Sequence, residues 1–448
     1  MRLPKKIFFF SIISTIFIFI KPQPSIAITL DNRLGVPIAA PAYPDRHQQQ
    51  DLLSFASHKA YNLGFRSIEL WLHPNVCNTH LSKPSIDPYG FYQTTKWCTA
   101  NGQFKQPSLA WLASQPEFKK VFSLPFSTFF ITMDSLNPQS LNQRKVARLN
   151  RIANQNEIDS LYRDVYQLTR YLIEQYGKTQ KTFILTNGNE LDWSLTAKNH
   201  CIPNCENIPA DPISIKNAIL WINTTHQAIE DAKKQSPKTQ LKIWHSVEIN
   251  KTLNHQLATA ITKVIPNSHQ DLVGWSAYEI NFWLKQNKDV PKLFINQLNY
   301  LANLTPDSSN FGNRNIYISE IGFQENKITG SHIYTNLTTL INSAFKWHMP
   351  YFVYWELYDN NCQRFLPTNN QCVGNWIIRP DGTESNIYTK VLSKYVIKKS
   401  NFPGDLNHDL IVDILDYNLL LQKYNHPYSI NDYQNIIKYF GKNYRKNH

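Results

Sequence analysis

The chain has 448 residues, of which 42% are hydrophobic and 18% are charged, and its formal net charge is +13 at pH 7. Lysine and arginine are scattered along the sequence and no nucleic-acid-binding motif is present, which argues against a nucleic-acid partner. Beyond the first 27 residues, no stretch is long and apolar enough to span a bilayer, so no permanent membrane span is expected there.

The N-terminal segment has the three parts of a secretory signal. Basic residues open it, residues 7–20 are almost wholly apolar, and a small-residue cleavage site ends at Ala27. A permanent membrane anchor is the alternative, but this apolar stretch is shorter than the roughly 20 residues that span a bilayer. We therefore expect residues 1–27 to be removed and the protein to be secreted, free outside the cell or associated with its surface. The segment contains four basic residues and no acidic one, so the remainder carries +9.

Residues 28–398 alternate between short apolar runs rich in β-forming residues and longer stretches with helical periodicity. Eight candidate strands alternating with helices predict an α/β fold, a (β/α)8 TIM barrel. A doubly wound open sheet and a division into two domains are the alternatives. The predicted strands are residues 36–40, 67–72, 128–133, 182–186, 241–244, 272–276, 316–319 and 351–354, and the clearest helices are 157–176, 213–234, 292–304 and 334–347.

All six cysteines follow the expected cleavage site, and four of them lie in the long segments 73–120 and 191–211 after the second and fourth strands. An even number of cysteines in an oxidising compartment predicts disulfides. A structural zinc site is the alternative, but the spacing lacks paired C-x-x-C motifs or nearby histidines. Among the connectivities that remain open, we predict the local pairs Cys77–Cys98, Cys201–Cys205 and Cys362–Cys372.

Two glutamates directly follow predicted strands that lie nearly opposite each other in an eight-stranded barrel. The fourth strand leads into Asn189 and Glu190, and the seventh leads into Glu320. Active sites of such barrels are built at the C-terminal ends of the strands, so both carboxyl groups are expected in one cleft. Cleavage of a glycosidic bond with retention needs such a pair about 5–5.5 Å apart, one as acid/base and one as nucleophile.

This placement resembles the retaining glycoside hydrolases of clan A, whose barrels carry Asn-Glu after strand four and Glu after strand seven. The resemblance implies that Glu190 is the general acid/base, that Glu320 is the nucleophile, and that Asn189 bonds the sugar 2-hydroxyl. Tyr278, after the sixth strand, is similar to the residue that orients the nucleophile in the clan. Trp355, after the eighth, is similar to the tryptophan beneath the reacting sugar.

One position departs from the pattern of the clan. Many members place an arginine near the end of strand two, where this chain has Glu69, whereas Arg66 lies at the start of that strand. Without a cation beside it, Glu320 is expected to have a raised pKa. His245, after the predicted fifth strand, is a candidate substrate-binding residue, with a purely structural histidine as the alternative. Other candidates for the cleft are Trp71, Asp134 and Trp193.

Residues 403–448 are expected to form a small all-α module with a calcium loop. Oxygen-bearing side chains recur there at the spacing of an EF-hand loop, and calcium takes about 6–8 oxygen ligands. Loop and following helix resemble a dockerin repeat, with a degenerate second copy near residues 430–441. The resemblance implies one structural calcium ion and a possible cohesin-like partner; an acidic turn between amphipathic helices is the alternative. The expected ligands are Asp405, Asn407, Asp409, Ile411 through its carbonyl oxygen, Asp413 and Asp416.

The sequence thus predicts a secreted retaining glycoside hydrolase that cleaves O-glycosidic bonds of an extracellular polysaccharide by double displacement. No organic cofactor is expected for this reaction. A catalytically inactive carbohydrate-binding barrel is one alternative, favoured by Glu69 at the arginine position. A surface scaffold or adhesion protein that acts through the dockerin-like tail is another.

Overall fold

The computed structural model describes most of the predicted barrel and two helices of the tail. The described residues are 30–38, 52–73, 97, 99, 104–188, 190–196, 209–253, 259–281, 289–327, 331–363, 366–397, 412, 414–423 and 430–442.

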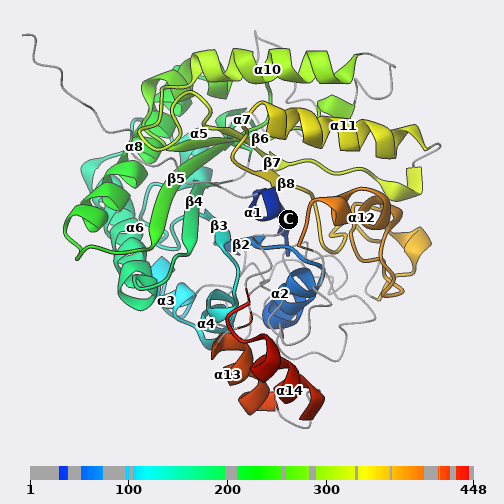
Figure 1. The fold of residues 1–448 in the computed structure, drawn as a ribbon. Helices are drawn as coiled ribbons and strands as arrows, with labels where there is room; N and C mark the ends of the chain where they lie inside the picture. The colour runs from blue at the N-terminus through cyan, green and yellow to red at the C-terminus, as the bar shows by residue number, and fades with distance from the viewer. Residues whose placement is uncertain are drawn as a thin grey trace, which may run out of the picture.

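Eight parallel strands close into a barrel, in the order in which they occur along the chain (Figure 1). The first strand pairs with the second on one side and with the eighth on the other, where Leu34 lies opposite Phe352. This closure confirms the predicted TIM barrel and excludes the open sheet and the two-domain division for these strands. The strands are β1 (Leu34–Pro37), β2 (Ser67–Leu72), β3 (Thr128–Met133), β4 (Thr182–Asn187), β5 (Lys242–Ile249), β6 (Leu272–Ser276), β7 (Ile316–Glu320) and β8 (Phe352–Val353).

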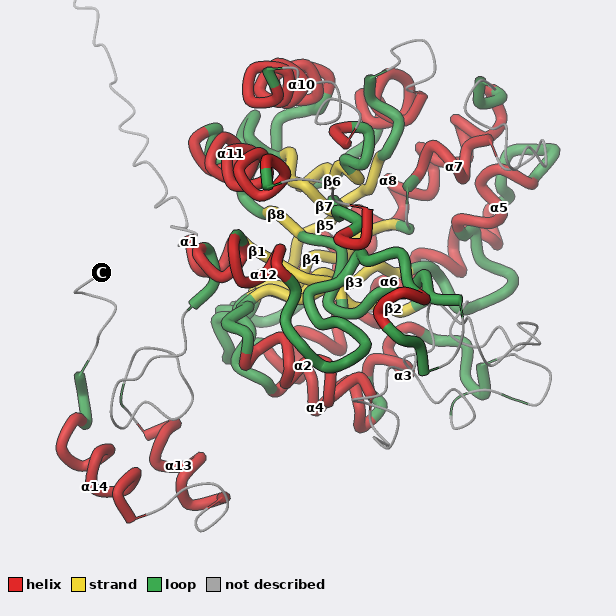
Figure 2. The backbone as a smooth tube through the Cα atoms, turned by 90° about the vertical axis from the view of Figure 1, so that its right-hand side faces the viewer, coloured by secondary structure: helices red, strands yellow, loops and turns green. Residues whose placement is uncertain are grey.

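Helices surround the strands as an outer layer (Figures 1 and 2). Four long helices, α6 (Gln155–Tyr176), α8 (Pro212–Lys234), α10 (Val290–Leu304) and α11 (His332–Lys346), match the helices that periodicity predicted. Asn154 and Glu157 begin α6 with a capping box, in which each side chain bonds the backbone of the other residue. The α-helices flanking the barrel are α1 (Leu30–Arg33), α2 (Leu52–Asn62), α3 (Leu109–Ala113), α4 (Pro116–Ser123), α5 (Gln143–Arg148), α6 (Gln155–Tyr176), α7 (Leu191–Thr196), α8 (Pro212–Lys234), α10 (Val290–Leu304), α11 (His332–Lys346) and α12 (Asn386–Lys390).

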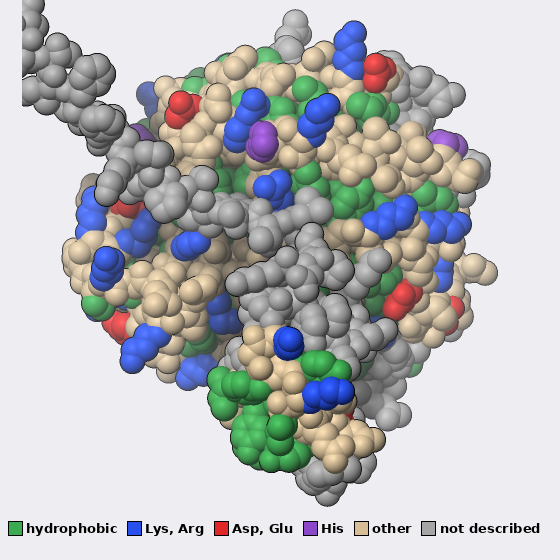
Figure 3. Space-filling view, in the orientation of Figure 1, with side chains coloured by type: hydrophobic (Ala, Val, Ile, Leu, Met, Phe, Trp, Pro, Cys, Tyr) green, Lys and Arg blue, Asp and Glu red, His purple; other side chains and the backbone are tan. Residues whose placement is uncertain are grey.

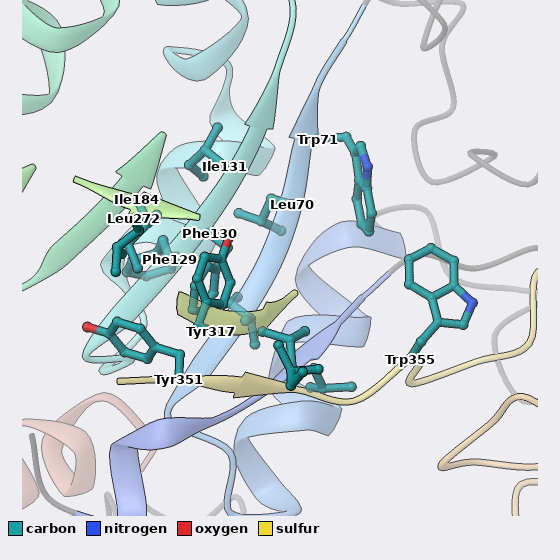
Figure 4. Packing of buried hydrophobic residues seen from close by; sticks show 14 of the residues in the cluster. Leu70, Trp71, Phe129, Phe130, Ile131, Ile184, Leu272, Tyr317, Tyr351 and Trp355 are labelled. Carbon is teal, nitrogen blue, oxygen red and sulfur yellow. The ribbon is translucent and has the colours of Figure 1, made fainter. Parts of the chain in front are cut away.

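Large aromatic side chains fill the barrel interior, because alternate residues of each strand point inward and outward. Phe130 contacts Tyr317 and Tyr351 across the interior, with ring centroids 5.5 and 5.1 Å apart (Figure 4). Its neighbour Phe129 points the other way and stacks on Phe183 of the next strand at 5.0 Å. Aromatic packing therefore closes the barrel below the ends of the strands, where the polar residues gather.

The pairing of β6 with β7 contains a bulge close to the predicted nucleophile. Gly274 lies opposite Tyr317, but two positions later Ser276 lies opposite Glu320, so Ser319 is an extra residue on β7. A bulge changes the direction in which the following side chains point. Glu320 is thereby presented at the end of the barrel together with Ser319.

One of the three predicted disulfides lies among the described residues. Cys362 and Cys372 are bonded to each other, which confirms that local pair. The bond closes a loop after β8, near the C-terminal end of the barrel. The cysteines of the other two predicted pairs (Cys77, Cys98, Cys201 and Cys205) lie outside the described residues.

The tail contains two helices, α13 (Ile414–Lys423) and α14 (Ile430–Tyr439), which pack against each other (Figure 2). Among the described tail residues, Val412, Leu420 and Ile436 form a buried core separate from that of the barrel. On the visible face, lysine and arginine are scattered and hydrophobic side chains gather on the tail (Figure 3). Among the residues that the structure describes, no helix combines the length and the apolar character needed to cross a membrane.

Candidate active site

Glu190 follows β4, at the end of the barrel where the chain enters α7. Its backbone has a φ of 47°, in the left-handed region that residues other than glycine rarely adopt. Its Oε1 accepts a hydrogen bond of 2.9 Å from Ser276 Oγ at the end of β6. Its backbone N–H donates a bond of 3.0 Å to Glu248 Oε2 in β5. Contacts from two other strands therefore hold this glutamate at the mouth of the barrel.

Glu320 is the last residue of β7, and its side chain is only 6% exposed. Its carbonyl oxygen accepts a hydrogen bond of 2.7 Å from the N–H of Ala277, beside the bulge. Ser276 thus pairs with Glu320 through the backbone and bonds Glu190 through its hydroxyl. The two glutamates that the sequence singled out are brought to the same end of the barrel by one serine.

Three more buried glutamates line the same end of the barrel. In β5, Glu248 accepts a bond of 2.7 Å from Ser319 Oγ through Oε1. In β2, Glu69 accepts a bond of 2.7 Å from Thr132 Oγ1 through Oε1, and its Oε2 has no hydrogen-bond partner within the described part of the chain. Glu356, beyond β8, is fully buried. We refer to Glu69, Glu190, Glu248, Glu320 and Glu356 as the glutamate cluster.

Burial raises the pKa of every member of the glutamate cluster, because lost hydration disfavours the charged form. The pKa of Glu69 rises to about 8, although the hydrogen bond from Thr132 opposes the shift. For Glu320, repulsion from Glu248 and Glu190 adds to burial and raises the pKa well above its ordinary range. The cluster therefore retains protons at pH values where solvated glutamates are ionised.

Two predicted sugar-binding residues also lie at this end. Tyr278 is partly buried after β6, and its pKa is raised first by burial and then by the charges of Glu320 and Glu190. Trp355 follows β8 and meets Trp71 of β2 edge to face, with ring centroids 6.1 Å apart (Figure 4). Asn189, the third residue of the predicted pattern, lies outside the described residues.

His245 is not at the mouth of the barrel, which corrects the prediction that it lines the cleft. Its ring bonds the Asn187 side chain and lies 5.6 Å from the ring of His226 in α8. The following residue, Ser246, bonds the hydroxyl of the inward-pointing Tyr317 at 3.1 Å. Because successive side chains of a strand alternate, His245 points outward to the helical layer. Its position is that of a buried structural histidine.

The arginine of β2 does not approach the glutamate cluster. Arg66 lies over the ring of Tyr61 at 3.9 Å and donates a bond of 2.9 Å to the carbonyl of Phe65, at the start of the strand. Among the described residues at β2, the side chain that joins the glutamate cluster is therefore Glu69 and not Arg66.

Asp134 and Trp193, two further candidates for the cleft, differ in exposure: the first is buried and the second is partly exposed. Asp134, after β3, is buried; its carboxylate accepts backbone bonds from Ser135 and Gln143 and lies 3.8 Å from His73 Nε2. These bonds give Asp134 a structural role. Trp193 in α7 is 39% exposed, and the Nζ of Lys251 lies 4.4 Å from its ring centroid. The Trp193 ring is therefore partly exposed, with the ammonium group of Lys251 against it.

Of the expected calcium ligands, the structure describes one. Asp416 is fully buried in the first turn of α13, the place of the last ligand of an EF-hand loop. Asp405, Asn407, Asp409, Ile411 and Asp413 lie outside the described residues. Within the described ranges, metal-binding atoms converge only at Asp359 with Cys362 and Cys372, whose sulfurs form the disulfide.

Comparison with known proteins gives matches in structure but not in sequence. No protein-family model matches the chain, and no curated protein matches it. A GH5_18 protein from Bifidobacterium longum subsp. infantis superposes with a TM-score of 0.51 at 12% identity, over 81% of this chain and 78% of its own. A GH5_18 protein from Streptomyces cattleya, solved in complex with GlcNAc, gives 0.51 at 11% identity over 82% and 79%. At this identity the similarity establishes the shared TIM-barrel fold.

Proposed function

We propose that the protein is a secreted retaining glycoside hydrolase that cleaves O-glycosidic bonds of an extracellular polysaccharide. The observation that carries the proposal is the meeting of Glu190 and Glu320 through Ser276 at the C-terminal end of the barrel. This is the end at which TIM-barrel enzymes build their active sites. The shared fold with GH5_18 glycoside hydrolases supports the same reaction class.

The reaction would proceed by double displacement. In the first step, the Glu320 carboxylate attacks the anomeric carbon while Glu190 gives its proton to the departing glycosidic oxygen. In the second step, Glu190 takes a proton from water, the water oxygen attacks the anomeric carbon, and the bond to Glu320 breaks. The raised pKa of Glu190 suits an acid that must hold its proton until the bond breaks.

The glutamate cluster determines how readily Glu320 ionises. The transition state of glycoside cleavage carries positive charge on the sugar ring. An ionised Glu320 in a buried site stabilises such a state more strongly than it would in water. Glu320 must nevertheless ionise, and its neighbours disfavour that. We infer that Glu69, with its raised pKa, stays neutral at pH 7 and so limits the repulsion.

Product analysis tests the proposal. Purified protein is incubated with mannan, β-glucan, galactan, xylan and GlcNAc-containing oligosaccharides, the last because the Streptomyces cattleya protein was solved with GlcNAc. We expect new reducing ends from at least one substrate, with the anomeric configuration retained in NMR spectra of the first products. Glu320→Gln should lower kcat by at least about 10³-fold, while the variant still binds the substrate.

Two results would contradict the mechanism. Inversion of configuration would exclude a glycosyl-enzyme at Glu320. Binding without any new reducing end would instead favour an inactive carbohydrate-binding barrel, the second candidate, which Glu69 at the cation position supports.

For the tail we propose one structural calcium ion, bound by Asp405, Asn407, Asp409, Asp413, Asp416 and the carbonyl of Ile411, and no organic cofactor for the barrel. The buried position of Asp416 at the start of α13 supports the calcium site. Docking to a cohesin-like partner, the role implied by the dockerin resemblance, stays a prediction. It can be tested by pull-down with purified cohesin domains.

A further inference from the structure

Glu248 bonds the chain next to both proposed catalytic glutamates. Its Oε2 accepts the backbone N–H of Glu190 at 3.0 Å, and its Oε1 accepts the hydroxyl of Ser319, the neighbour of Glu320, at 2.7 Å. The side chain is 3% exposed and comes from β5. One buried carboxyl group therefore links the residues that follow β4 and end β7.

The bond to Glu190 falls on a strained part of the backbone. Glu190 has a φ of 47°, and such left-handed residues persist only where surrounding contacts hold them. The N–H of Glu190 is held by Glu248, and its side chain is held by Ser276. Trp193 adds a third contact, since its N–H donates to the Glu190 carbonyl at 2.9 Å and its side chain bonds the Glu190 carboxyl group. Glu248 is the residue that holds the Glu190 N–H, so its removal frees the peptide group that precedes the strained residue.

We propose that Glu248 is a positioning residue, which fixes the backbone of Glu190 so that its carboxyl group faces the leaving oxygen beside Glu320. The inference rests on the proposed glycosidase function and adds a residue to its machinery. Glu248 itself does not touch the substrate in this proposal. It acts through the N–H of Glu190 and through Ser319.

The test distinguishes a displaced general acid, Glu190, from a general loss of activity caused by a distorted active site. A 2,4-dinitrophenyl glycoside needs no proton on its leaving group, whereas a phenyl glycoside does. With aryl glycosides of the sugar that the wild-type protein releases, Glu248→Ala should lower kcat/KM about 10²-fold for the phenyl substrate and less than 10-fold for the dinitrophenyl substrate. KM for the polysaccharide should stay within about 3-fold, because binding groups are unchanged.

Two further variants sharpen the result. Ser319→Ala leaves the bond to Glu190 in place, so its loss for the phenyl substrate should be below 10-fold, smaller than that of Glu248→Ala. Glu157→Gln is the matched control, since Glu157 is also buried and accepts a backbone N–H, at 2.9 Å from Asn154, but belongs to the capping box of α6. We expect it to lower thermal stability and leave the ratio of the two aryl substrates unchanged.

A crystal structure of Glu248→Ala decides the proposal even if no substrate is turned over. We expect Glu190 to leave the left-handed region or to lose its bond to Ser276. An unchanged Glu190 in the variant would overturn the positioning role, and so would equal losses for both aryl substrates. Absence of turnover in the wild-type protein would instead count against the proposed function, since the structural measurement does not depend on activity.

Discussion

Glu69 is a buried carboxyl group in β2 and a member of the glutamate cluster. Burial raises its pKa to about 8, and Thr132 is its hydrogen-bond donor. A carboxyl group with this pKa is mostly neutral at pH 7, so Glu69 adds little negative charge to the cluster. The site therefore limits repulsion by keeping a proton.

The raised pKa of Glu69 predicts a stability that falls with pH. The folded protein keeps this proton up to about pH 8, whereas the unfolded chain loses it near 4.5. Between these values the folded state binds more protons, so the free energy of unfolding decreases as pH rises, by at most about 1.4 kcal/mol for each step of one in pH. Glu69→Gln should therefore raise the unfolding free energy more at pH 8 than at pH 5, as measured by urea unfolding.

Glu157, whose pKa is lowered by folding, is the control for this measurement. The pKa of Glu157 is lowered to about 2, first by the hydrogen bond from Arg151. Its stabilisation is present above about pH 4.5 and is lost only as pH falls toward 2. Glu157→Gln should thus destabilise the protein equally at pH 5 and pH 8. Parallel pH dependence of Glu69→Gln and the wild-type protein would contradict the raised pKa of Glu69.

At the scale of elements, the length of β5 explains two errors of the sequence-based prediction. Glu248 was not predicted as a site residue, and His245 was predicted to line the cleft. The apolar run predicts a strand over 241–244, but the strand continues to Ile249. If the strand ended at residue 244, His245 would be the first residue after it and Glu248 would lie in the following loop. In the longer strand, alternation turns His245 outward and Glu248 inward. Polar residues inside a strand weaken the apolar signal, which is why the site-forming end of β5 was not predicted.

The sequence predicts the positions of Glu190 and Glu320 because each comes directly after a short, strongly apolar run, which indicates where the strand ends. The bulge that presents Glu320 has no comparable signal. It depends on the pairing of β6 with β7, which residues far apart in the sequence determine.

Gly274 is the small residue that lets β6 and β7 approach beside this bulge. A Cβ at this position would lie 2.7 Å from Ser319 Cβ and 3.0 Å from the Tyr317 ring. Gly274→Ala should therefore displace Ser319 and destabilise the fold by about 1–3 kcal/mol, measured by urea unfolding. Gly312→Ala is the control, because a Cβ there meets nothing within 4 Å and only its φ of 57° opposes the change. Equal losses for the two variants would show that packing at the bulge is not the cause.

At the scale of the whole molecule, the alternation of strands and helices predicts the order of the elements. It does not determine whether the sheet stays open or closes into a barrel. An open sheet and a closed barrel share the same local pattern. The difference lies in the pairing of β1 with β8, between residues more than 300 positions apart, such as Leu34 and Phe352. The aromatic interior around Phe130 and Tyr317 stabilises the closed form, and no sequence window contains both partners.

The described part of the tail has its own small core. Its buried hydrophobic residues are Val412, Leu420 and Ile436, while Leu421 and Ile437 on the same helices are each 60% exposed. A unit of this size usually needs a metal, a disulfide or a partner to stay folded. The proposed calcium ion would supply that stability, because ligands that are ordered only in the folded state couple metal binding to folding.

Calorimetry of the full chain tests this coupling. We expect the tail to unfold in a transition of its own, at a temperature that falls when EGTA removes calcium, while the barrel transition stays in place. Asp416→Asn should weaken the response to added calcium, since Asp416 is buried at the ligand position that begins α13. Asp432, in the first turn of α14 and not a proposed ligand, provides the control Asp432→Asn, which should respond as the wild-type protein does. An unchanged melting curve in EGTA, with no calcium bound in native mass spectrometry, would contradict the site and leave the tail as two helices joined by an acidic turn.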